Sequence, residues 1–258
     1  MVSNPQLFEM TRPQIEAAMA AGYDTVVINF GATEQHGLHL PMGTDSIWGE
    51  ALGLRITQAL GDALQLPGIR IGRSDHHLAF AGSLSVSEAT FNGIVHDICH
   101  NMAHHGFKHI ALIPTHGGNF RPIGAAAALV RPTLPNVNII AYDDLFAFMD
   151  VLFGKAAEHG FTPFQTGAHA GENETSLILA LRPDLVDLDA AQAGFMGDPI
   201  QIAEKIFREG FRAVTETGVL GDPAGASAEF GEGYLNAMTE LFTDFIRQAR
   251  DAWSPTEG

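Results

Sequence analysis

Cysteine is almost absent from this chain of 258 residues, since Cys99 is the only one. A disulfide within the chain is therefore excluded, and Cys99 stands in a helical pattern where a small buried hydrophobic residue is common. Long apolar runs are missing too, because no stretch reaches the roughly 18 residues that a membrane-spanning helix needs. The stretch MVSNPQLFEMTRPQ has neither the basic nor the apolar segment of a secretory signal. We therefore expect a cytoplasmic protein without a membrane partner.

Positive charge is also scarce. The chain has 14 Lys and Arg against 30 Asp and Glu, which gives a formal net charge of −16. Nucleic acids and anionic membranes bind basic surfaces, so we expect neither as a partner. Some of the acidic residues can also be metal ligands, whose bound charge a formal count ignores.

Repeats, low-complexity tracts and Pro- or Ser-rich linkers are missing as well. Instead, β-branched runs alternate with amphipathic stretches, and the length suits one α/β domain or two small ones. The runs at 24–30, 68–74, 108–115 and 136–143 predict strands. Helices are predicted at 11–22, 44–62, 83–106, 119–132, 145–153, 171–181 and 231–253. Ser85 and Glu88 are spaced as a capping box for the third of these helices, and Asn119 is placed to cap the fourth. The alternation predicts a largely parallel sheet covered by helices on both faces.

Carboxylates and imidazoles gather where these strands end. GATEQHGLHLPMGTD follows the first strand, THGGN follows a later strand, and GAHAGENETS precedes a helix. Ligands of parallel sheets bind beyond the carboxyl ends of the strands, so the first two clusters should meet in space. Oxygen and nitrogen ligands without a thiolate suit Zn²⁺, Mn²⁺ or Fe²⁺. The candidate ligands are Glu34, His36, Asp45, His116, His169, Glu172 and Glu174.

Several of these residues have a simpler interpretation. Asp45 begins a predicted helix, where it either bridges two cations or serves as an ordinary N-cap. Gly117 and Gly118 either form a tight turn or offer backbone amides to a developing oxyanion. His76 and His77, on a loop at the same sheet edge, are candidates for substrate contact or for supporting the ligands.

Three of these stretches resemble the signature motifs of the creatininase family, also called the creatinine amidohydrolase family. They are GATEQHGLHLPMGTD, PTHGGN and HAGENETSLILAL, in the family's order, and GDPAGASAEFGEGY resembles its C-terminal segment. The resemblance implies a single creatininase-like domain over residues 1–258, with a three-layer α/β/α fold and a mostly parallel central sheet. It also implies a small-molecule substrate and a homo-oligomer, often a hexamer.

The resemblance further implies two divalent metal ions per subunit, either Zn, Mn or Fe. Glu34, His36, Asp45 and His116 fall on the family's metal-ligand positions, with Asp45 as the bridging ligand. In members with a HAGE motif, a further carboxylate comes from that motif, where this chain has Glu172.

His169 falls on the family position assigned to acid/base catalysis. Creatininase itself takes its further carboxylate from a position that is Gly118 here. It also has a tryptophan shortly before the catalytic histidine, and FTPFQTGAHAGE has none. Both departures group the chain with the HAGE-type members, which include formamide deformylases, a mycofactocin peptide-processing enzyme and an inosose hydrolase.

The expected function is that of a metal-dependent hydrolase, in which an activated water opens a small cyclic amide or cleaves a formamide C–N bond. His169 would pass a proton to the leaving group. His39 and Glu174 either hold the metal ligands in position without binding the metal or have packing roles. One alternative is hydrolytic carbon–carbon ring opening of a cyclic polyol ketone such as a dehydro-inosose. Another is a non-catalytic, metal-dependent small-molecule binding protein.

Overall fold

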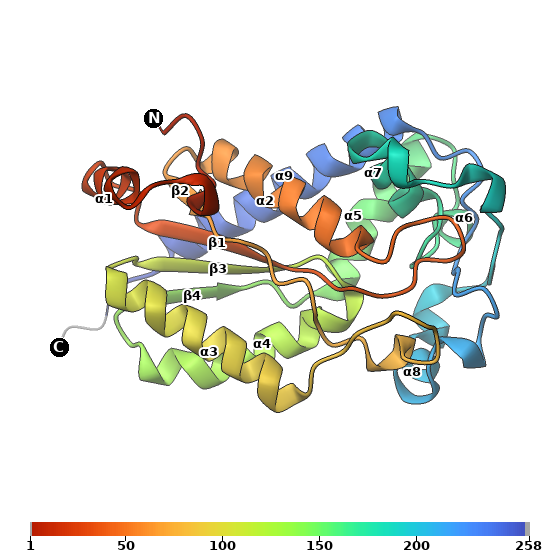
Figure 1. The fold of residues 1–258 in the computed structure, drawn as a ribbon, viewed down its shortest axis with the longest axis horizontal. Helices are drawn as coiled ribbons and strands as arrows, with labels where there is room; N and C mark the ends of the chain where they lie inside the picture. Colours follow the sequence, from red (N-terminus) through yellow and green to blue (C-terminus); the bar gives the residue numbers. More distant parts are fainter. Residues whose placement is uncertain (1, 256–258) are drawn as a thin grey trace.

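A sheet of parallel strands runs through the centre of the computed structural model, which describes residues 2–255. The strands are β1 (Thr25–Phe30), β2 (Ala63–Gln65), β3 (His109–Pro114) and β4 (Asn138–Ala141), in the spatial order β2-β1-β3-β4. Each neighbouring pair is parallel, so the carboxyl ends lie together, toward the right of Figure 1.

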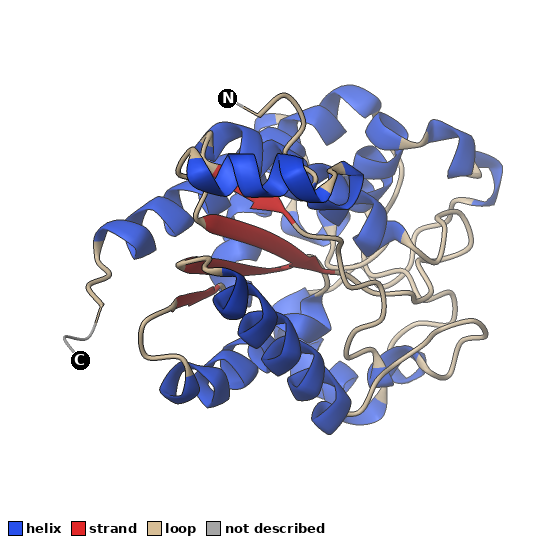
Figure 2. Ribbon diagram, turned by 60° about the vertical axis from the view of Figure 1, so that its left-hand side comes forward, coloured by secondary structure: helices blue, strands red, loops and turns tan. Residues whose placement is uncertain are grey.

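Helices cover both faces of the sheet (Figure 2). On one face lie α3 (Glu88–His105) and α4 (Phe120–Val130). On the other lie α2 (Thr44–Leu60), α5 (Leu145–Glu158), α7 (Glu172–Leu181) and α9 (Ala228–Asp251). The expected three-layer α/β/α fold with a parallel sheet is therefore confirmed.

The core has two layers, one on each face of the sheet, because side chains alternate along the strands. Val26 and Ile28 of β1 pack with α3 and α4, whereas Val27 packs with α2, α5 and α9. Successive side chains of a strand point to opposite faces, so the apolar run of β1 supplies both layers of the core. Cys99 of α3 is buried among apolar neighbours, and this burial raises the pKa of its thiol to about 12.

The remaining elements are short or peripheral. They are α1 (Arg12–Ala20), α6 (Pro163–Thr166), α8 (Pro199–Glu209) and the 3₁₀ turns η1 (Leu7–Glu9), η2 (Asp75–His77), η3 (Gly117–Asn119), η4 (Arg131–Thr133), η5 (Pro183–Leu185), η6 (Leu188–Ala190) and η7 (Phe211–Ala213). The α8 helix packs on η2 and η7, beyond the carboxyl ends of the strands (Figure 1). Within residues 2–255, every helix is too short or too polar to cross a membrane.

One predicted strand is wrong. The run 68–74 holds only an isolated bridge between Ile69 and Phe30, while the strand of this region is β2. Pro67 lies between the two segments and has no N–H to donate. The N–H groups on either side of it, of Leu66 and Ile69, donate to the carbonyls of Val27 and Asn29 of β1. This segment therefore has one residue more than β1 here, and the regular ladder ends although the chain continues alongside β1.

Two helix caps also differ from the prediction. The cap of α3 is Ser87, whose hydroxyl accepts a hydrogen bond from the Thr90 N–H, so the Ser85–Glu88 capping box is wrong. Asn119 precedes α4 without a side-chain cap bond. Its side-chain amide donates instead to the carbonyls of Phe30 and Gly31, which ties the segment after β3 to the end of β1.

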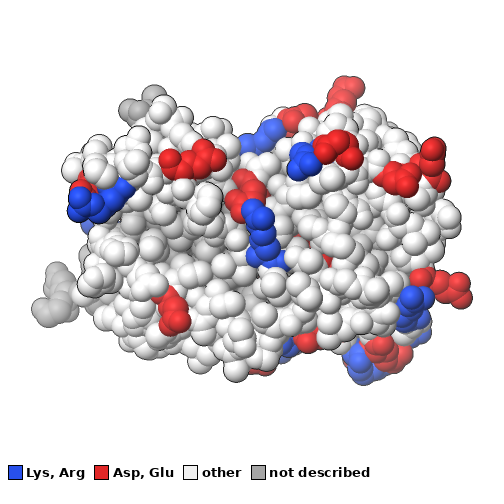
Figure 3. Space-filling model, in the orientation of Figure 1, with Lys and Arg blue, Asp and Glu red and all other residues white. Residues whose placement is uncertain are grey.

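The surface drawn in Figure 3 carries few charges. Basic side chains lie beside acidic ones there, and most of this face is uncharged. The net charge of −16 therefore does not gather as one acidic patch on the face shown.

Candidate metal centre

The parallel register brings the two predicted clusters together. Phe30 at the end of β1 pairs with Pro114 at the end of β3. Glu34 follows the first strand and His116 follows the second, and Glu34 Oε1 lies 3.1 Å from His116 Nδ1. Two residues 82 positions apart in the sequence thus meet because their strands end side by side.

Asp45 lies in the first turn of α2, where it is buried. Its Oδ1 is 3.2 Å from His36 Nε2, and its Oδ2 is 3.3 Å from His116 Nδ1. The N-cap of α2 is Gly43 rather than Asp45, so the N-cap interpretation of Asp45 is wrong. Asp45 instead turns one oxygen toward each of two histidines.

Three histidines turn one ring nitrogen toward these carboxylates and the other away from them. The outer nitrogens of His36, His116 and His169 lie 3.1, 3.1 and 2.6 Å from the carbonyl oxygens of Glu34, Arg73 and Gln35. A carbonyl only accepts, so each outer nitrogen carries a hydrogen, and in the neutral ring the inner nitrogen keeps a lone pair. A lone pair facing a carboxylate is repulsive unless a cation lies between them.

The buried carboxylates lack donors of their own. Among the described residues, no group donates a hydrogen bond to either oxygen of Glu34 or to Oδ2 of Asp45. Burial without a partner costs free energy, and a metal ion removes that cost by direct coordination. The donor set therefore fits a cation bound between the imidazoles and the carboxylates.

The pKa values of two histidines also indicate that the centre favours positive charge. Burial would lower the pKa of His36, but Asp45, Glu174 and Glu34 outweigh it and raise that pKa to about 10. The pKa of His116 is raised well above its usual value against the same burial, mainly by Glu34 and Asp45. Without a metal ion these two rings therefore hold a second proton, so positive charge is favoured between them and the carboxylates.

Glu174, rather than Glu172, joins the centre. Glu174 Oε2 lies 3.7 Å from His36 Nε2 and 4.0 Å from His169 Nδ1. Burial raises the pKa of Glu174 to about 7, although His36 opposes this effect.

Glu172 faces away from the centre, so its predicted role as a metal ligand is wrong. Its Oε1 accepts a hydrogen bond from the Ser176 hydroxyl at 2.7 Å, and its Oε2 accepts one from the Tyr234 hydroxyl at 2.5 Å. Residues two positions apart on a helix point about 200° apart, so α7 can direct only one of its two glutamates to the site.

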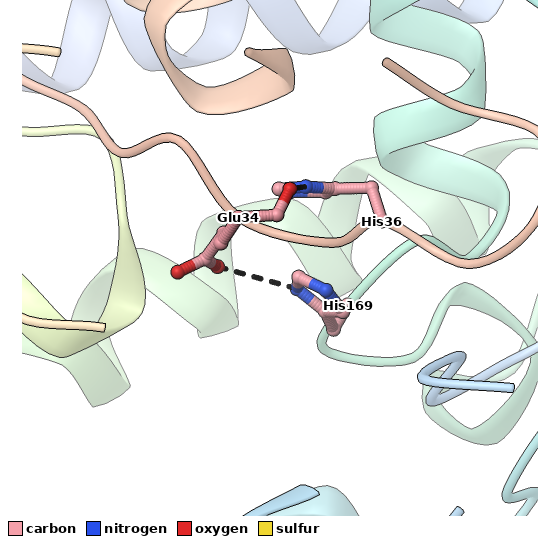
Figure 4. Close-up of side chains that lie close together, drawn as sticks. All are labelled: Glu34, His36 and His169. Carbon is pink, nitrogen blue, oxygen red and sulfur yellow. Dashed lines mark hydrogen bonds and ion pairs between the residues drawn. The ribbon is translucent and has the colours of Figure 1, made fainter. Parts of the chain in front are cut away.

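In the part of the chain that the structure describes, three groups of residues have ligand atoms within 4.8 Å of one another. They are Glu34, Asp45 and His116; His36, Asp45 and Glu174; and Glu34, His36 and His169. The first two groups share Asp45 and otherwise use different residues. Figure 4 shows members of the third group, with Nδ1 of His169 3.9 Å from Oε1 of Glu34.

The turn between His169 and α7 has an unusual backbone conformation. Ala170 has a φ of 50°, the left-handed region that non-glycine residues seldom adopt. Its N–H donates to Glu174 Oε2, so this turn connects the histidine to the glutamate. Burial and the neighbouring His36 hold the pKa of His169 well below its usual value, and its ring is therefore neutral.

Gln35 is a supporting residue that the sequence did not indicate. Its side-chain amide lies 3.1 Å from His77 Nδ1 and can donate to it. His77 Nε2 then lies 3.2 Å from Glu34 Oε1, without the geometry of a hydrogen bond. Gln35 also contacts His169 through its main-chain carbonyl, so it orients two histidines from one position.

Two other histidines lie next to the centre, and one of them, His76, lines a cavity beside it. The ring of His76 stacks on that of His116 at 5.6 Å, and burial lowers the pKa of His76 to about 3. His39 instead contacts the Thr175 hydroxyl at 2.9 Å, on α7. His39 thus supports the helix that carries Glu174, and no ring nitrogen of His39 belongs to the ligand groups found among the described residues.

Gly118 has to be a glycine at this position. A Cβ there would collide with the Arg73 carbonyl and with His116 Nε2. A carboxylate at this position is therefore incompatible with the backbone. Gly117 and Gly118 both line the cavity beside the centre, where their amides are candidates for contact with an oxyanion.

The cavity has a volume of about 120 Å³ and opens from the metal centre. Its polar residues include Glu34, Asp45, His116, His169 and Glu174, which we call the floor. The rest of the lining is largely apolar and comes mainly from α5 and α8.

A parallel α/β/α fold with buried carboxylates and imidazoles at the carboxyl edge of its sheet defines a metal-binding α/β enzyme. The chain matches the sequence model of the creatininase family, described as creatinine amidohydrolase, over residues 8–246. It is 30% identical to the mycofactocin precursor peptide peptidase of Mycolicibacterium smegmatis, with 89% of this chain and 85% of that protein covered. It is 33% identical to the creatinine amidohydrolase of Pseudomonas putida, with coverage of 70% and 73%.

Solved structures agree with these sequence relatives. A tryptophan mutant of creatininase superposes with a TM-score of 0.79 at 29% identity, covering 95% of this chain and 98% of the other. Related creatininase structures are described as zinc–zinc and manganese forms. The chain belongs to the creatininase family and is a metal-dependent amidohydrolase. The non-catalytic alternative is therefore wrong.

Proposed function

We propose that the enzyme hydrolyses the C–N bond of a small amide, opening a cyclic amide or cleaving a formamide, with two divalent ions held on either side of Asp45. The observation that carries this proposal is the division of the Asp45 oxygens between His36 and His116. A carboxylate that bridges two cations presents its oxygens in this way.

Each ion would have its own residues besides Asp45. Glu34 and His116 would hold one ion, while His36 and Glu174 would hold the other. This oxygen and nitrogen set suits Zn²⁺, Mn²⁺ or Fe²⁺. Two bound ions would polarise the substrate carbonyl and lower the pKa of a water toward about 7.

His169 moves the proton in this scheme. Its Nδ1 keeps a lone pair that faces Glu34, because its Nε2–H donates to the Gln35 carbonyl. Nδ1 accepts a proton from the attacking water as the oxygen bonds to the carbonyl carbon. The same proton passes to the leaving nitrogen as the C–N bond breaks, which gives a carboxylic acid and an amine.

Asn173 would orient the substrate. It is buried in the first turn of α7 and lines the cavity. Its Oδ1 accepts a hydrogen bond from the Glu174 N–H, which fixes the amide plane. Its Nδ2 donates to no described residue and is free to donate to a substrate oxygen, together with the amides of Gly117 and Gly118.

A carbon–carbon hydrolase is the second candidate, since a relative in Thermotoga maritima is named 3-dehydro-scyllo-inosose hydrolase, at 27% identity over 72% of this chain and 60% of that protein. The lining favours the amide over a polyol, because few polar groups are available to bind several hydroxyls. Assays of cyclic amides and formamides beside a cyclic polyol ketone separate the two reactions.

The test of the two-ion centre is an Asp45→Asn variant, with Asp97→Asn on the exposed face of α3 as a control of matched chemistry. We expect Asp45→Asn to stay folded by circular dichroism, to lose bound metal by elemental analysis and to lose hydrolysis. The control should keep all three properties. A folded and fully active Asp45→Asn enzyme would end the two-ion proposal.

A further inference from the structure

One side of the cavity is an apolar wall that the proposed hydrolysis does not use. Helix α5 contributes Leu145, Phe146 and Met149 to it. Ile206 and Phe207 of α8 and Phe211 of η7 form the rest of it. We call these six residues the apolar wall.

The apolar wall reaches the catalytic floor directly. The ring of Phe211 lies 4.0 Å from that of His77 and 4.8 Å from that of His169. The ring of Phe207 lies 4.9 Å from that of His76. If the substrate amide lies at the floor, a substituent one or two bonds away from the amide would therefore contact these aromatic rings.

Two large aromatic residues of the wall are half exposed. Phe146 is 53% exposed and Phe207 is 52% exposed. Both line the cavity, and they come from two different helices. Burying such rings under a ligand is favourable by about 25 cal/mol for each Å² of apolar surface.

The lining offers no cation to a substrate. Among the described residues that line the cavity, none is Lys or Arg, and the charged groups all belong to the floor. A phosphate or carboxylate on the part of the substrate beyond the floor would be desolvated without a partner, which is costly. A polyol would likewise lose hydrogen bonds to water without replacing them.

We propose that the substrate is an uncharged amide carrying an aromatic or branched aliphatic group, which packs on the apolar wall while the amide reaches the floor. This rests on the proposed amide hydrolysis and specifies its substrate class. Phosphorylated formamides, amides with an anionic end and polyol ketones are excluded as preferred substrates.

Binding can be measured separately from turnover through Trp48, which lines the cavity. The chain has only two tryptophans, so a Trp253→Phe background leaves Trp48 as the single reporter. The probes are acetamide, phenylacetamide and phenylacetamide carrying a 4-carboxylate on the ring, added to the metal-loaded enzyme. We expect phenylacetamide to bind at least about tenfold more tightly than acetamide and than the charged derivative.

Variants test whether the preference for phenylacetamide comes from the apolar wall. In the same background, Phe207→Ala should weaken phenylacetamide binding about threefold to tenfold and leave acetamide binding unchanged. Phe164→Ala is the matched control, because Phe164 is also exposed but lies on α6, outside the lining. Metal content and circular dichroism verify that both variants are intact.

The outcomes separate the two proposals. Equal binding of acetamide and phenylacetamide, equal binding of the charged derivative, or no effect of Phe207→Ala would overturn the substrate class. Turnover is measured in parallel with N-formyl derivatives of glycinamide, leucinamide and phenylalaninamide. Tight phenylacetamide binding without hydrolysis of any formamide would leave the apolar wall correct and count against the proposed reaction.

Discussion

Two glutamates of α7 have opposite surroundings, although both are largely buried and they lie two positions apart. Glu172 has a hydroxyl donor on each oxygen, from Ser176 and Tyr234. Glu174 faces the lone-pair nitrogens of His36 and His169 and receives only the Ala170 N–H. A buried carboxylate with its own donors holds helices together, whereas one facing imidazole lone pairs is suited to hold a cation.

The largest expected effect on activity comes from substituting Glu174, the glutamate that faces the histidines. We expect Glu174→Gln to lose one of the bound ions and to lower kcat/KM about 1,000-fold, because an ion contributes several kcal/mol to transition-state stabilisation. Glu172→Gln is the matched control, and elemental analysis should find its metal content unchanged. Loss of metal from the control and not from Glu174→Gln would reverse the assignment.

Removing the proposed proton carrier should have a smaller effect. We expect His169→Gln to lower kcat about 100-fold, which is the lower range for a general acid–base group. Its metal content and KM should change little, because His169 is outside the two ligand groups that share Asp45. Loss of an ion from this variant would make His169 a ligand, as its approach to Glu34 and His36 allows.

The Tyr234→Phe variant tests the proposed role of Glu172 in stabilising the fold. This change removes the donor to Glu172 Oε2 between α7 and α9 and leaves the site untouched. We expect a loss of about 1–3 kcal/mol in the free energy of unfolding, measured in urea, because a buried acceptor loses its partner. Unchanged metal content would separate this variant from Glu174→Gln, while a loss of metal would contradict the division of roles.

The smallest effect on stability is expected at Asp62, a partly exposed carboxylate far from the centre. The Arg250 guanidinium donates hydrogen bonds to Asp62 and holds the pKa of that carboxyl below its usual value. The pair therefore stabilises the fold above about pH 4 and loses this contribution as the pH falls through the lowered pKa. Asp62 is 41% exposed, so we expect Asp62→Asn to cost less than about 1 kcal/mol at pH 7. Urea unfolding at pH 7 and pH 3 should show this difference shrinking at the lower pH; a difference that grows would contradict it.

The sequence predicted the meeting of Glu34 and His116, because parallel strands end at one edge whatever the details of packing. It also predicted that the helix carrying Asp45 begins beside them. It assigned the ligand in GENETS to Glu172, whereas Glu174 faces the centre. That depends on how α7 packs on α9, where the missing side chain of Gly231 lets the Ser176 carbonyl come close. The apolar wall was missed for the same reason, since α8 was not predicted and its position depends on contacts with η2 and η7.

The most direct measurement of the central claim is the number of ions bound per chain. The purified protein is stripped with a chelator, titrated with Zn²⁺ or Mn²⁺ and analysed for metal against protein concentration. We expect saturation at about two ions per chain, because two groups of ligands share Asp45. Saturation at about one ion, or no specific binding at all, would contradict the account.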